Sequence, residues 1–184
     1  MPALASGSSR RRWLADRAQT LLQMSALWMG LPAAALCDPA PAPRPAAIGD
    51  VVRWPAVQLL DGTTLASPAP GQLATVVVFF STTCPFCARH NVHVQKLSES
   101  AHGLPLRVLG VAHDRNADHV RTYLGRRGLG FDVSMDQLAL HSALSLMKGI
   151  PLTCVVDRQQ RLREVIRGEM FESDVLGLAK WARA

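Results

Sequence analysis

The chain alternates between apolar blocks and amphipathic stretches from residue 48 to its end. Five blocks rich in β-branched and aromatic residues predict strands over Thr75–Phe80, Leu106–Ala112, Phe131–Met135, Leu152–Asp157 and Leu162–Ile166. Stretches with apolar residues at helical spacing predict helices from Cys84 to about His102, and over Asn116–Arg127, Gln137–Met147 and Glu172–Ala182. This order, which ends in two strands joined by a polar turn and a closing helix, predicts an α/β fold with a mixed central sheet flanked by helices.

A shorter pattern precedes the first long strand. Val57–Leu60 and Thr63–Leu65 are extended, partly apolar segments on either side of the pair Asp61-Gly62. Such a pair tolerates positive φ and is typical of a tight turn, so the segment predicts an N-terminal β-hairpin. The folded domain is expected to start near Ile48 and to cover residues 48–184.

Residues 1–36 have the pattern of an export signal. Residues 1–19 are polar and basic, Thr20–Leu36 is mostly apolar, and Ala33–Ala35 offers the small residues that a signal peptidase needs. The apolar run is short and interrupted, so a permanent membrane anchor is the less favoured alternative. Ser9–Leu14 resembles a twin-arginine signal, although a general secretory signal with a long basic start fits equally well. Either route leads to an oxidising compartment, the periplasm.

Length and composition fit one domain behind this leader. Of the 184 residues, 48% are hydrophobic and 18% are charged, which is enough to form a core. Residues 37–47 alternate proline and alanine and predict a stiff linker. Four arginines and one aspartate give residues 1–36 a net charge of +3, which leaves +3 of the total +6 for the rest. This ordinary balance, without an aromatic-interleaved basic patch, argues against nucleic-acid binding.

The candidate chemistry lies at the motif C-P-F-C, residues 84–87. Ser81–Thr83 end the preceding strand with hydroxylic residues that suit a turn or a helix N-cap, and Pro85 suits the first helical position. The two sulfurs, three positions apart on one turn, can close a disulfide. The first thiol also lies where the helix dipole and unpaired N–H groups stabilise a thiolate. We therefore predict a redox site with Cys84 as the nucleophile and Cys87 as the resolving thiol.

The segments around this motif resemble those of a known family. The hairpin LLDGTTL, the strand and motif VVVFFSTTCPFC, and the late segment GIPLTCVVD together resemble the TlpA/ResA-like branch of exported proteins with a thioredoxin-like fold, over residues 48–184. The resemblance implies a cis peptide bond at Ile150–Pro151 beside the two sulfurs. It also implies that the Ile150 backbone, together with Pro85 and Phe86, contacts an extended protein substrate, and that Pro151 keeps metal ions away from the thiols.

Three positions depart from the family pattern. Thr83 stands where the family commonly has tryptophan, and Val78 stands where cytosolic thioredoxins have a buried aspartate. His90 stands where many members have a glutamate that helps to move protons. Imidazole titrates near neutral pH, so His90 is the candidate group for proton transfer. The favoured interpretation, however, is that His90 simply packs or caps within its helix, as part of the apolar stripe formed by Phe86, His90, Val94 and Leu97.

The two other cysteines receive different interpretations. Cys154 lies within a strand pattern and is expected to be a small core residue. Cys37 lies at the signal junction and is expected to be removed with the leader or, as the less favoured alternative, to carry a lipid. An inert structural disulfide between Cys84 and Cys87 is not favoured, because so short a loop gives little stabilisation.

Two other chemistries are weaker alternatives. Cys84, Cys87 and His90 are three positions apart, so the pair of thiolates could bind a soft ion such as Cu(I), with His113 as a further ligand. The copper-carrying relatives of the fold, however, usually separate their cysteines by three residues and lack a proline like Pro151, so no metal is expected. A peroxidase is also less favoured, because the segment before Cys84 lacks the upstream proline of that class.

We therefore expect an exported thiol–disulfide oxidoreductase without a dissociable cofactor. The resemblance favours a reductase that prepares apocytochrome or copper-site thiols, with a disulfide-forming oxidase and a copper carrier as alternatives. The direction depends on the reduction potential, which spans roughly 150 mV among proteins of this fold. Expected partners are protein thiols and disulfides and a membrane thiol reductase as electron donor, with no nucleic acid, and the protein is expected to be a monomer.

Overall fold

The computed structural model describes residues 46–145 and 147–183. The proposed leader, residues 1–36, and most of the proposed linker, residues 37–47, lie outside the described residues, as does Cys37. Among the described helices, none is both long enough and apolar enough to cross a membrane.

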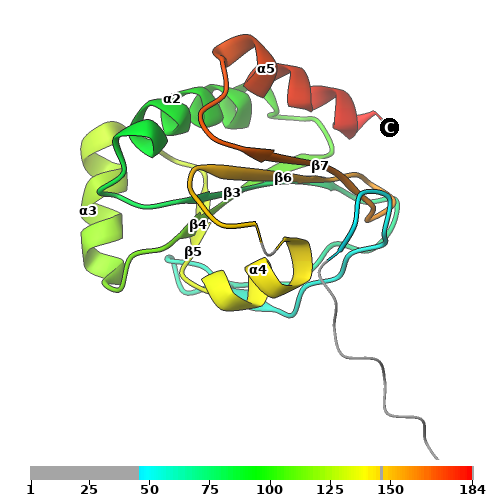
Figure 1. Cartoon of the computed structure of the whole chain (residues 1–184), viewed down its shortest axis with the longest axis horizontal. Coiled ribbons are helices and arrows are strands. Elements are labelled where there is room, and N and C mark those ends of the chain that lie inside the picture. Colours follow the sequence, from blue (N-terminus) through cyan, green and yellow to red (C-terminus); the bar gives the residue numbers. More distant parts are fainter. Residues whose placement is uncertain (1–45, 146, 184) are drawn as a thin grey trace, which may run out of the picture. The chain divides into compact units, whose positions relative to one another are not determined.

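A five-stranded mixed sheet forms the centre of the fold (Figure 1). Its strands are β3 (Ala74–Phe80), β4 (Leu106–Ala112), β5 (Asp132–Ser134), β6 (Leu152–Val156) and β7 (Leu162–Arg167). They lie in the order β5-β4-β3-β6-β7, and β6 runs antiparallel to both β3 and β7, whereas β4 runs parallel to β3 and β5. Every residue of β3 is buried, because helices cover both faces of the sheet at this central strand.

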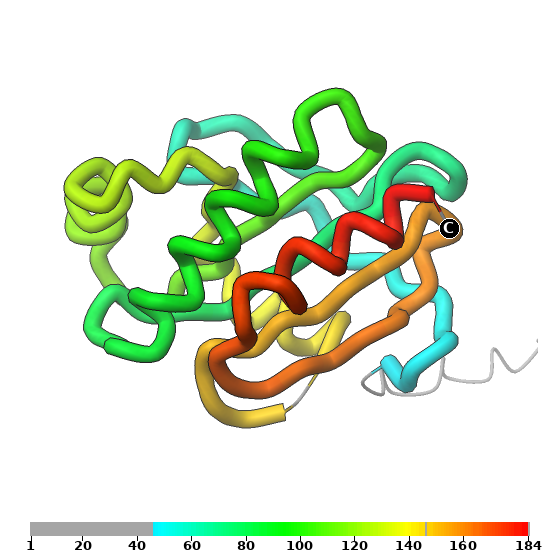
Figure 2. The backbone as a smooth tube through the Cα atoms, turned by 90° about the horizontal axis from the view of Figure 1, so that it is seen from above, coloured from blue at the N-terminus to red at the C-terminus, as the bar shows by residue number. Residues whose placement is uncertain are grey.

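The helices divide between the two faces of the sheet. The helices α2 (Pro85–Ser100) and α5 (Glu172–Gly177), the latter continued by the 3₁₀ helix η1 (Leu178–Ala182), lie side by side on one face (Figure 2). The helix α4 (Gln137–Leu144) covers the other face. The helix α3 (Ala117–Arg127) packs its buried residues into the same core as α2. It begins after the side-chain cap Asn116 and ends at Gly128, whose φ of 63° is a left-handed conformation that favours glycine.

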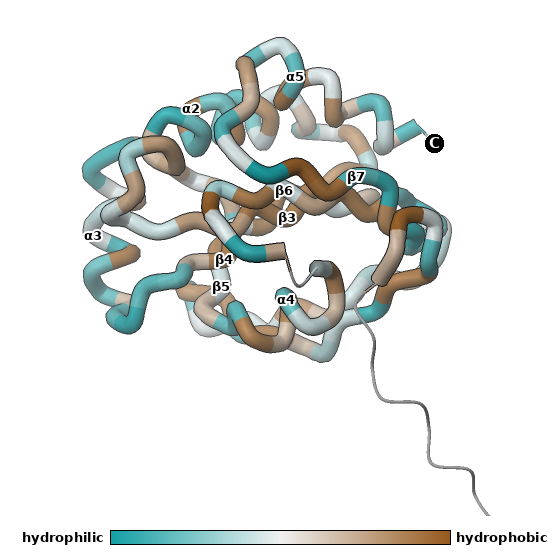
Figure 3. The backbone as a smooth tube through the Cα atoms, viewed as in Figure 1, coloured by the Kyte–Doolittle hydropathy of each residue, from teal (hydrophilic) through white to brown (hydrophobic). Residues whose placement is uncertain are grey.

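Alternation along β3 separates two hydrophobic cores. Val76, Val78 and Phe80 face α2, α3 and α5, whereas Val77 and Phe79 face α4 and the N-terminal segment. Figure 3 shows hydrophobic residues along the central strands of the sheet. Because successive side chains of a strand point to opposite faces, neighbouring residues on one strand can enter quite different surroundings.

The N-terminal hairpin is present as a small separate sheet. Its strands β1 (Val57–Gln58) and β2 (Thr64–Leu65) are antiparallel and shorter than the predicted segments. Ahead of the hairpin, the backbone N–H of Gly49 donates to the carbonyl of Leu162 at 2.7 Å, so residues close to the expected start at Ile48 already pair with β7. The predicted α/β fold, with a mixed sheet, flanking helices and an N-terminal hairpin, is confirmed.

The closing helix has its predicted bounds, with 3₁₀ geometry after Gly177. Two other details of the prediction were wrong. The helix expected to reach Met147 ends at Leu144, because Ser145 adopts an extended backbone. Phe86 does not belong to the buried stripe of α2, since its side chain is 55% exposed and Cys87 takes the buried position instead.

Candidate active site

The two cysteines of the motif occupy different environments at the start of α2. Cys84 is the N-cap residue and is half-buried, and Pro85 occupies the first turn as predicted. The Cys84 Sγ accepts a hydrogen bond from the backbone N–H of Cys87 at 3.3 Å. A thiolate at this atom would therefore receive a helix N–H directly, which is the arrangement that stabilises an anion at a helix start.

Cys87 lies behind Cys84 and is fully buried. Burial, followed by the hydrogen bond of its thiol to Cys84, raises the pKa of Cys87 to about 12. Both cysteines are free thiols in the structure, so this is the reduced arrangement. The half-exposed thiol is thus accessible from solvent, while the buried thiol next to it is a neutral SH group near neutral pH.

The second part of the site is the loop that precedes β6. The peptide bond between Ile150 and Pro151 is cis, which confirms the prediction. The carbonyl oxygen of Ile150 lies 4.0 Å from the Cys84 Sγ, and Pro151 is buried. The carbonyl of Pro151 accepts a hydrogen bond of 2.8 Å from the backbone N–H of Gly168, which ties this loop to the end of β7.

Asp114, which follows β4, holds the turn in front of Cys84. Its carboxylate accepts a hydrogen bond from the backbone N–H of Thr82 at 3.0 Å, and a second one from the Thr82 hydroxyl. The hydroxyl of Ser81 lies 3.5 Å from the same carboxylate, and Thr83 is exposed with its hydroxyl 3.1 Å from that of Ser81. Sequence reasoning missed this role of Asp114, although an acidic residue directly after a buried parallel strand was the available signal.

His90 is fully buried, and both of its ring nitrogens have partners. The backbone N–H of Met170 donates to Nδ1 at 3.3 Å, so the neutral ring carries its proton on Nε2 and donates it to the Thr153 hydroxyl at 3.1 Å. Burial, and then the neighbouring His93, lower the pKa of His90 to about 4. His90 therefore joins α2, β6 and the β7–α5 loop as a neutral imidazole near neutral pH.

The surface around Cys84 is partly apolar. Pro85 and Phe86 are exposed, and the Arg89 guanidinium lies over the Phe86 ring at 5.0 Å from its centroid. Arg89 also forms a two-pronged ion pair with Glu169, with its shortest N–O distance 2.6 Å. The loop that carries Glu169 is thereby held against the first two turns of α2.

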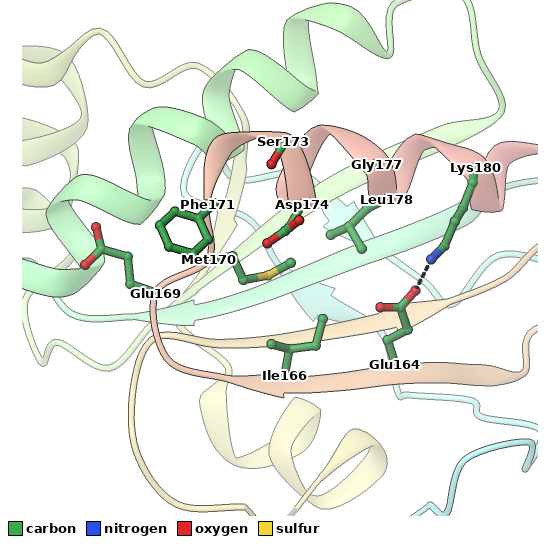
Figure 4. Close-up of a pocket in the computed structure, with 10 residues that line it drawn as sticks. All are labelled: Glu164, Ile166, Glu169, Met170, Phe171, Ser173, Asp174, Gly177, Leu178 and Lys180. Atoms are coloured by element: carbon green, nitrogen blue, oxygen red, sulfur yellow. Dashed lines mark ion pairs between the residues drawn. The ribbon is translucent and has the colours of Figure 1, made fainter.

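A groove of about 600 Å³ continues from this loop along β7 and α5 (Figure 4). Met170, Ile166 and Leu178 give it an apolar lining, and Glu164 pairs with Lys180 across it at 2.9 Å. Its lining residues do not include those of the C-P-F-C motif. The groove is therefore a neighbour of the candidate site and not the site itself.

The remaining candidates lie elsewhere. Cys154 is fully buried in the core on the α4 side, as expected of a core residue. His113 is bonded to His141, with 3.1 Å between the two Nε2 atoms. Within residues 46–145 and 147–183, no three His, Cys, Asp or Glu side chains gather as a metal ion would require.

The fold and this arrangement of thiols define the class of thioredoxin-fold thiol–disulfide oxidoreductases. The family model for redoxins matches residues 50–178, so the chain belongs to the redoxin family. No curated protein matches the sequence significantly. The thioredoxin-like fold that the sequence suggested is thus confirmed.

Solved structures share the fold at low sequence identity. A thiol:disulfide interchange protein of the thioredoxin family from Chlorobium tepidum superposes with a TM-score of 0.64 at 21% identity, covering 79% of this chain and 100% of that one. StoA from Bacillus subtilis gives a TM-score of 0.58 at 15% identity, covering 71% and 98%. A thioredoxin-like protein from Neisseria meningitidis gives 0.64 at 19% identity, covering 73% and 91%.

Proposed function

We propose that the protein is an exported thiol–disulfide oxidoreductase that reduces disulfides of protein substrates through Cys84 and Cys87. One observation carries this proposal: the half-exposed Cys84 Sγ receives a helix N–H at 3.3 Å and lies 4.0 Å from the Ile150 carbonyl, while Cys87 lies buried behind it. The redoxin family and structural neighbours named as thiol:disulfide interchange proteins support the thiol–disulfide exchange, without giving its direction.

The reaction has two steps. The Cys84 thiolate attacks one sulfur of a substrate disulfide, the substrate S–S bond breaks, and the other substrate sulfur leaves as a thiolate. Cys87 then loses its proton to solvent and attacks Cys84 Sγ, which releases the second substrate sulfur. The substrate gains two electrons, and Cys84 and Cys87 become a disulfide.

Phe86, Pro85 and the Ile150 backbone are the proposed contacts for an extended substrate segment, with Pro151 shaping the same surface. His90 stays a candidate for proton transfer, although either ring nitrogen would first have to leave its present partner, Met170 N–H or Thr153. The cycle needs an electron donor, for which we propose a membrane thiol reductase, and the working form is proposed to be a monomer. Apocytochrome and copper-site thiols are the proposed substrates.

The equilibrium reduction potential against glutathione tests the direction. A reductase requires a potential nearer to about −270 mV than to about −120 mV, the values that separate reducing from oxidising members of this fold. A potential at the oxidising end would support a disulfide-forming oxidase instead. Absence of any Cys84–Cys87 disulfide at all potentials would overturn the proposed function itself.

Export is tested separately by the mature N-terminus. The basic, apolar, small-residue order of residues 1–36 leads us to expect that about the first 35 residues are absent from exported protein. Intact mass of material from the periplasmic fraction measures this directly. Exported protein that retains Met1 would favour a membrane anchor over a cleaved signal.

A further inference from the structure

Asn91 is a buried amide without a partner. It lies on α2 one helical turn after Cys87, and its side chain is fully buried. Neither Oδ1 nor Nδ2 has a hydrogen-bond partner among the described residues. A buried polar group left unpaired destabilises the folded protein, because it has lost its hydrogen bonds to water. Such a group in a folded protein calls for a specific explanation, and a role in redox or catalytic chemistry is one of the few available.

The Tyr123 hydroxyl is a second unpaired polar group near Asn91 and Cys87. Its ring, from α3, packs beside Phe80 with 6.2 Å between centroids, and its hydroxyl has no hydrogen-bond partner among the described residues. Burial raises the pKa of Tyr123, the nearby Asn91 amide lowers it, and a charge on Cys87 raises it. Asn91, Tyr123 and Cys87 are therefore electrostatic neighbours, although the Asn91 amide and the Tyr123 hydroxyl do not have the geometry of a hydrogen bond.

Helix geometry allows the Asn91 side chain to reach toward the Cys87 thiol. Side chains on a helix lean toward its N-terminus and cover the turn before their own Cα. Residues four apart on one face are neighbours, and both Cys87 and Asn91 lie on the buried face of α2. Helix geometry therefore lets the Asn91 amide reach toward the turn that carries the Cys87 thiol, although no hydrogen bond joins the two in the structure.

We propose that Asn91 and Tyr123 form a polar site behind Cys87 that stabilises the Cys87 thiolate in the second step of exchange. This proposal rests on the proposed function. As the Cys87 S–H bond breaks and the proton passes to solvent, the Asn91 Nδ2–H₂ group donates to the new thiolate. Tyr123 is the positioning residue: in this step its hydroxyl moves into hydrogen-bond distance of the Asn91 Oδ1 and donates to it. Electrons move only among the sulfur atoms, from Cys87 through the Cys84 sulfur to the leaving substrate sulfur.

A chromogenic disulfide separates the two steps. The reduced protein is mixed in a stopped-flow instrument with 5,5′-dithiobis(2-nitrobenzoate), which releases one coloured thiol when Cys84 attacks and a second when Cys87 resolves the mixed disulfide. Every protein carries Cys37→Ser, so that this thiol does not contribute. The second phase is first-order, and its pH dependence reports the ionisation of Cys87.

Asn91→Leu keeps the volume of the side chain and removes the donor. We expect the second phase to slow about tenfold at each pH up to mildly alkaline values, which moves its rate–pH profile about one unit to higher pH, because a hydrogen bond to a charged group is worth that much. The first phase should not change. Tyr123→Phe should slow the second phase about threefold, a smaller loss because the hydroxyl acts through Asn91. Val92→Ala, an exposed neighbour on α2, is the control and should change neither phase.

A purely structural role for Asn91 gives a different result. Replacing an unpaired buried amide by leucine would then leave the protein equally or more stable, with the rate–pH profile of the second phase unchanged, and this result would overturn the proposal. If Asn91→Leu does not fold, an unchanged second phase in Tyr123→Phe decides against the proposal. A wild type without a second phase would instead overturn the proposed function.

Discussion

Cys87 and Cys154 are both fully buried thiols, but they lie in cores on opposite faces of the sheet. Cys154 lies in β6, opposite Val77 of β3 and Val165 of β7, and burial alone raises its pKa to about 12. Burial also raises the pKa of Cys87 to about 12, with a further contribution from its hydrogen bond to Cys84. Both thiols are therefore neutral near neutral pH.

The surroundings of the two sulfurs differ. Cys87 lies one turn after the half-exposed thiol of Cys84 at the start of α2, and it shares its face of α2 with the buried polar residues His90 and Asn91. Cys154 is surrounded by an apolar cluster. Burial and a raised pKa therefore do not distinguish a candidate redox thiol from a core cysteine. A second thiol nearby, at a helix N-terminus, does.

The largest expected effect comes from removing each sulfur in turn. Cys84→Ser should abolish disulfide exchange, because it removes the thiol that can reach a substrate. Cys87→Ser should still attack substrates but should trap them as mixed disulfides, detectable by mass spectrometry without reductant. Cys154→Ala is the matched control and should exchange at the wild-type rate. Loss of exchange in Cys154→Ala with a stable fold would break the comparison.

Acidification should expose the role of buried His90. Its pKa is about 4 in the folded protein, against about 6.5 in an unfolded chain, so the unfolded state binds more protons between these pH values. Stability therefore falls as the pH drops through this window, and the full contribution is present above about pH 6.5. The wild type should lose about 3 kcal/mol more than His90→Gln between pH 7 and pH 4.

Urea unfolding at the two pH values measures this difference. His119→Gln, which replaces an exposed imidazole, is the control and should lose as much stability as the wild type. An equal loss in wild type and His90→Gln would mean that His90 is not held neutral by its surroundings.

The next effect concerns the turn before Cys84. Asp114→Ala removes the acceptor of the Thr82 N–H and hydroxyl, so we expect a loss of about 1–3 kcal/mol in the free energy of unfolding. The same variant should slow the attack of Cys84, since its turn loses its anchor. Asp118→Ala, at an exposed carboxylate paired only with Arg121 in the part described, should cost about 0.5 kcal/mol or less. Equal losses in both variants would refute the anchoring role.

The smallest effect should distinguish protein substrates from small ones. Phe86→Ala removes an exposed ring beside Cys84, so the rate with a protein disulfide should fall about tenfold or less, as for one apolar contact of an interface. The rate with a small aromatic disulfide should not change. Val92→Ala, exposed on the same helix, should affect neither substrate. An equal reduction with both substrates would place Phe86 in the chemistry instead of in recognition.

Much of the fold follows from local pattern. The buried strand Leu106–Ala112 was predicted with its observed bounds, because a short β-branched run between turn residues has one interpretation. The cis bond at Ile150–Pro151 came from the family resemblance and is confirmed. Which residues of α2 face the core could not be predicted from its first turn. Phe86 and Cys87 are both apolar, and only packing decides which one is buried.

The polar surroundings of the thiols could not be predicted in this way. Asp114 reaches Thr82 from the loop after β4, and Tyr123 approaches Asn91 from another helix. Such contacts join residues far apart in sequence and have no periodicity of their own. From the sequence, His90 was a possible base, but a packing role was favoured. Its burial and two hydrogen bonds in the structure agree with that packing role.

The most direct test of the account is the rate at which each thiol of the reduced wild-type protein is alkylated. Iodoacetamide at mildly acidic pH, followed by peptide mapping, separates Cys84 from Cys87 and Cys154. We expect Cys84 to react first and by a wide margin, with Cys87 and Cys154 almost unmodified until the protein unfolds. Faster modification of Cys87 than of Cys84 would contradict the proposal that Cys84 is the nucleophile and Cys87 the resolving thiol.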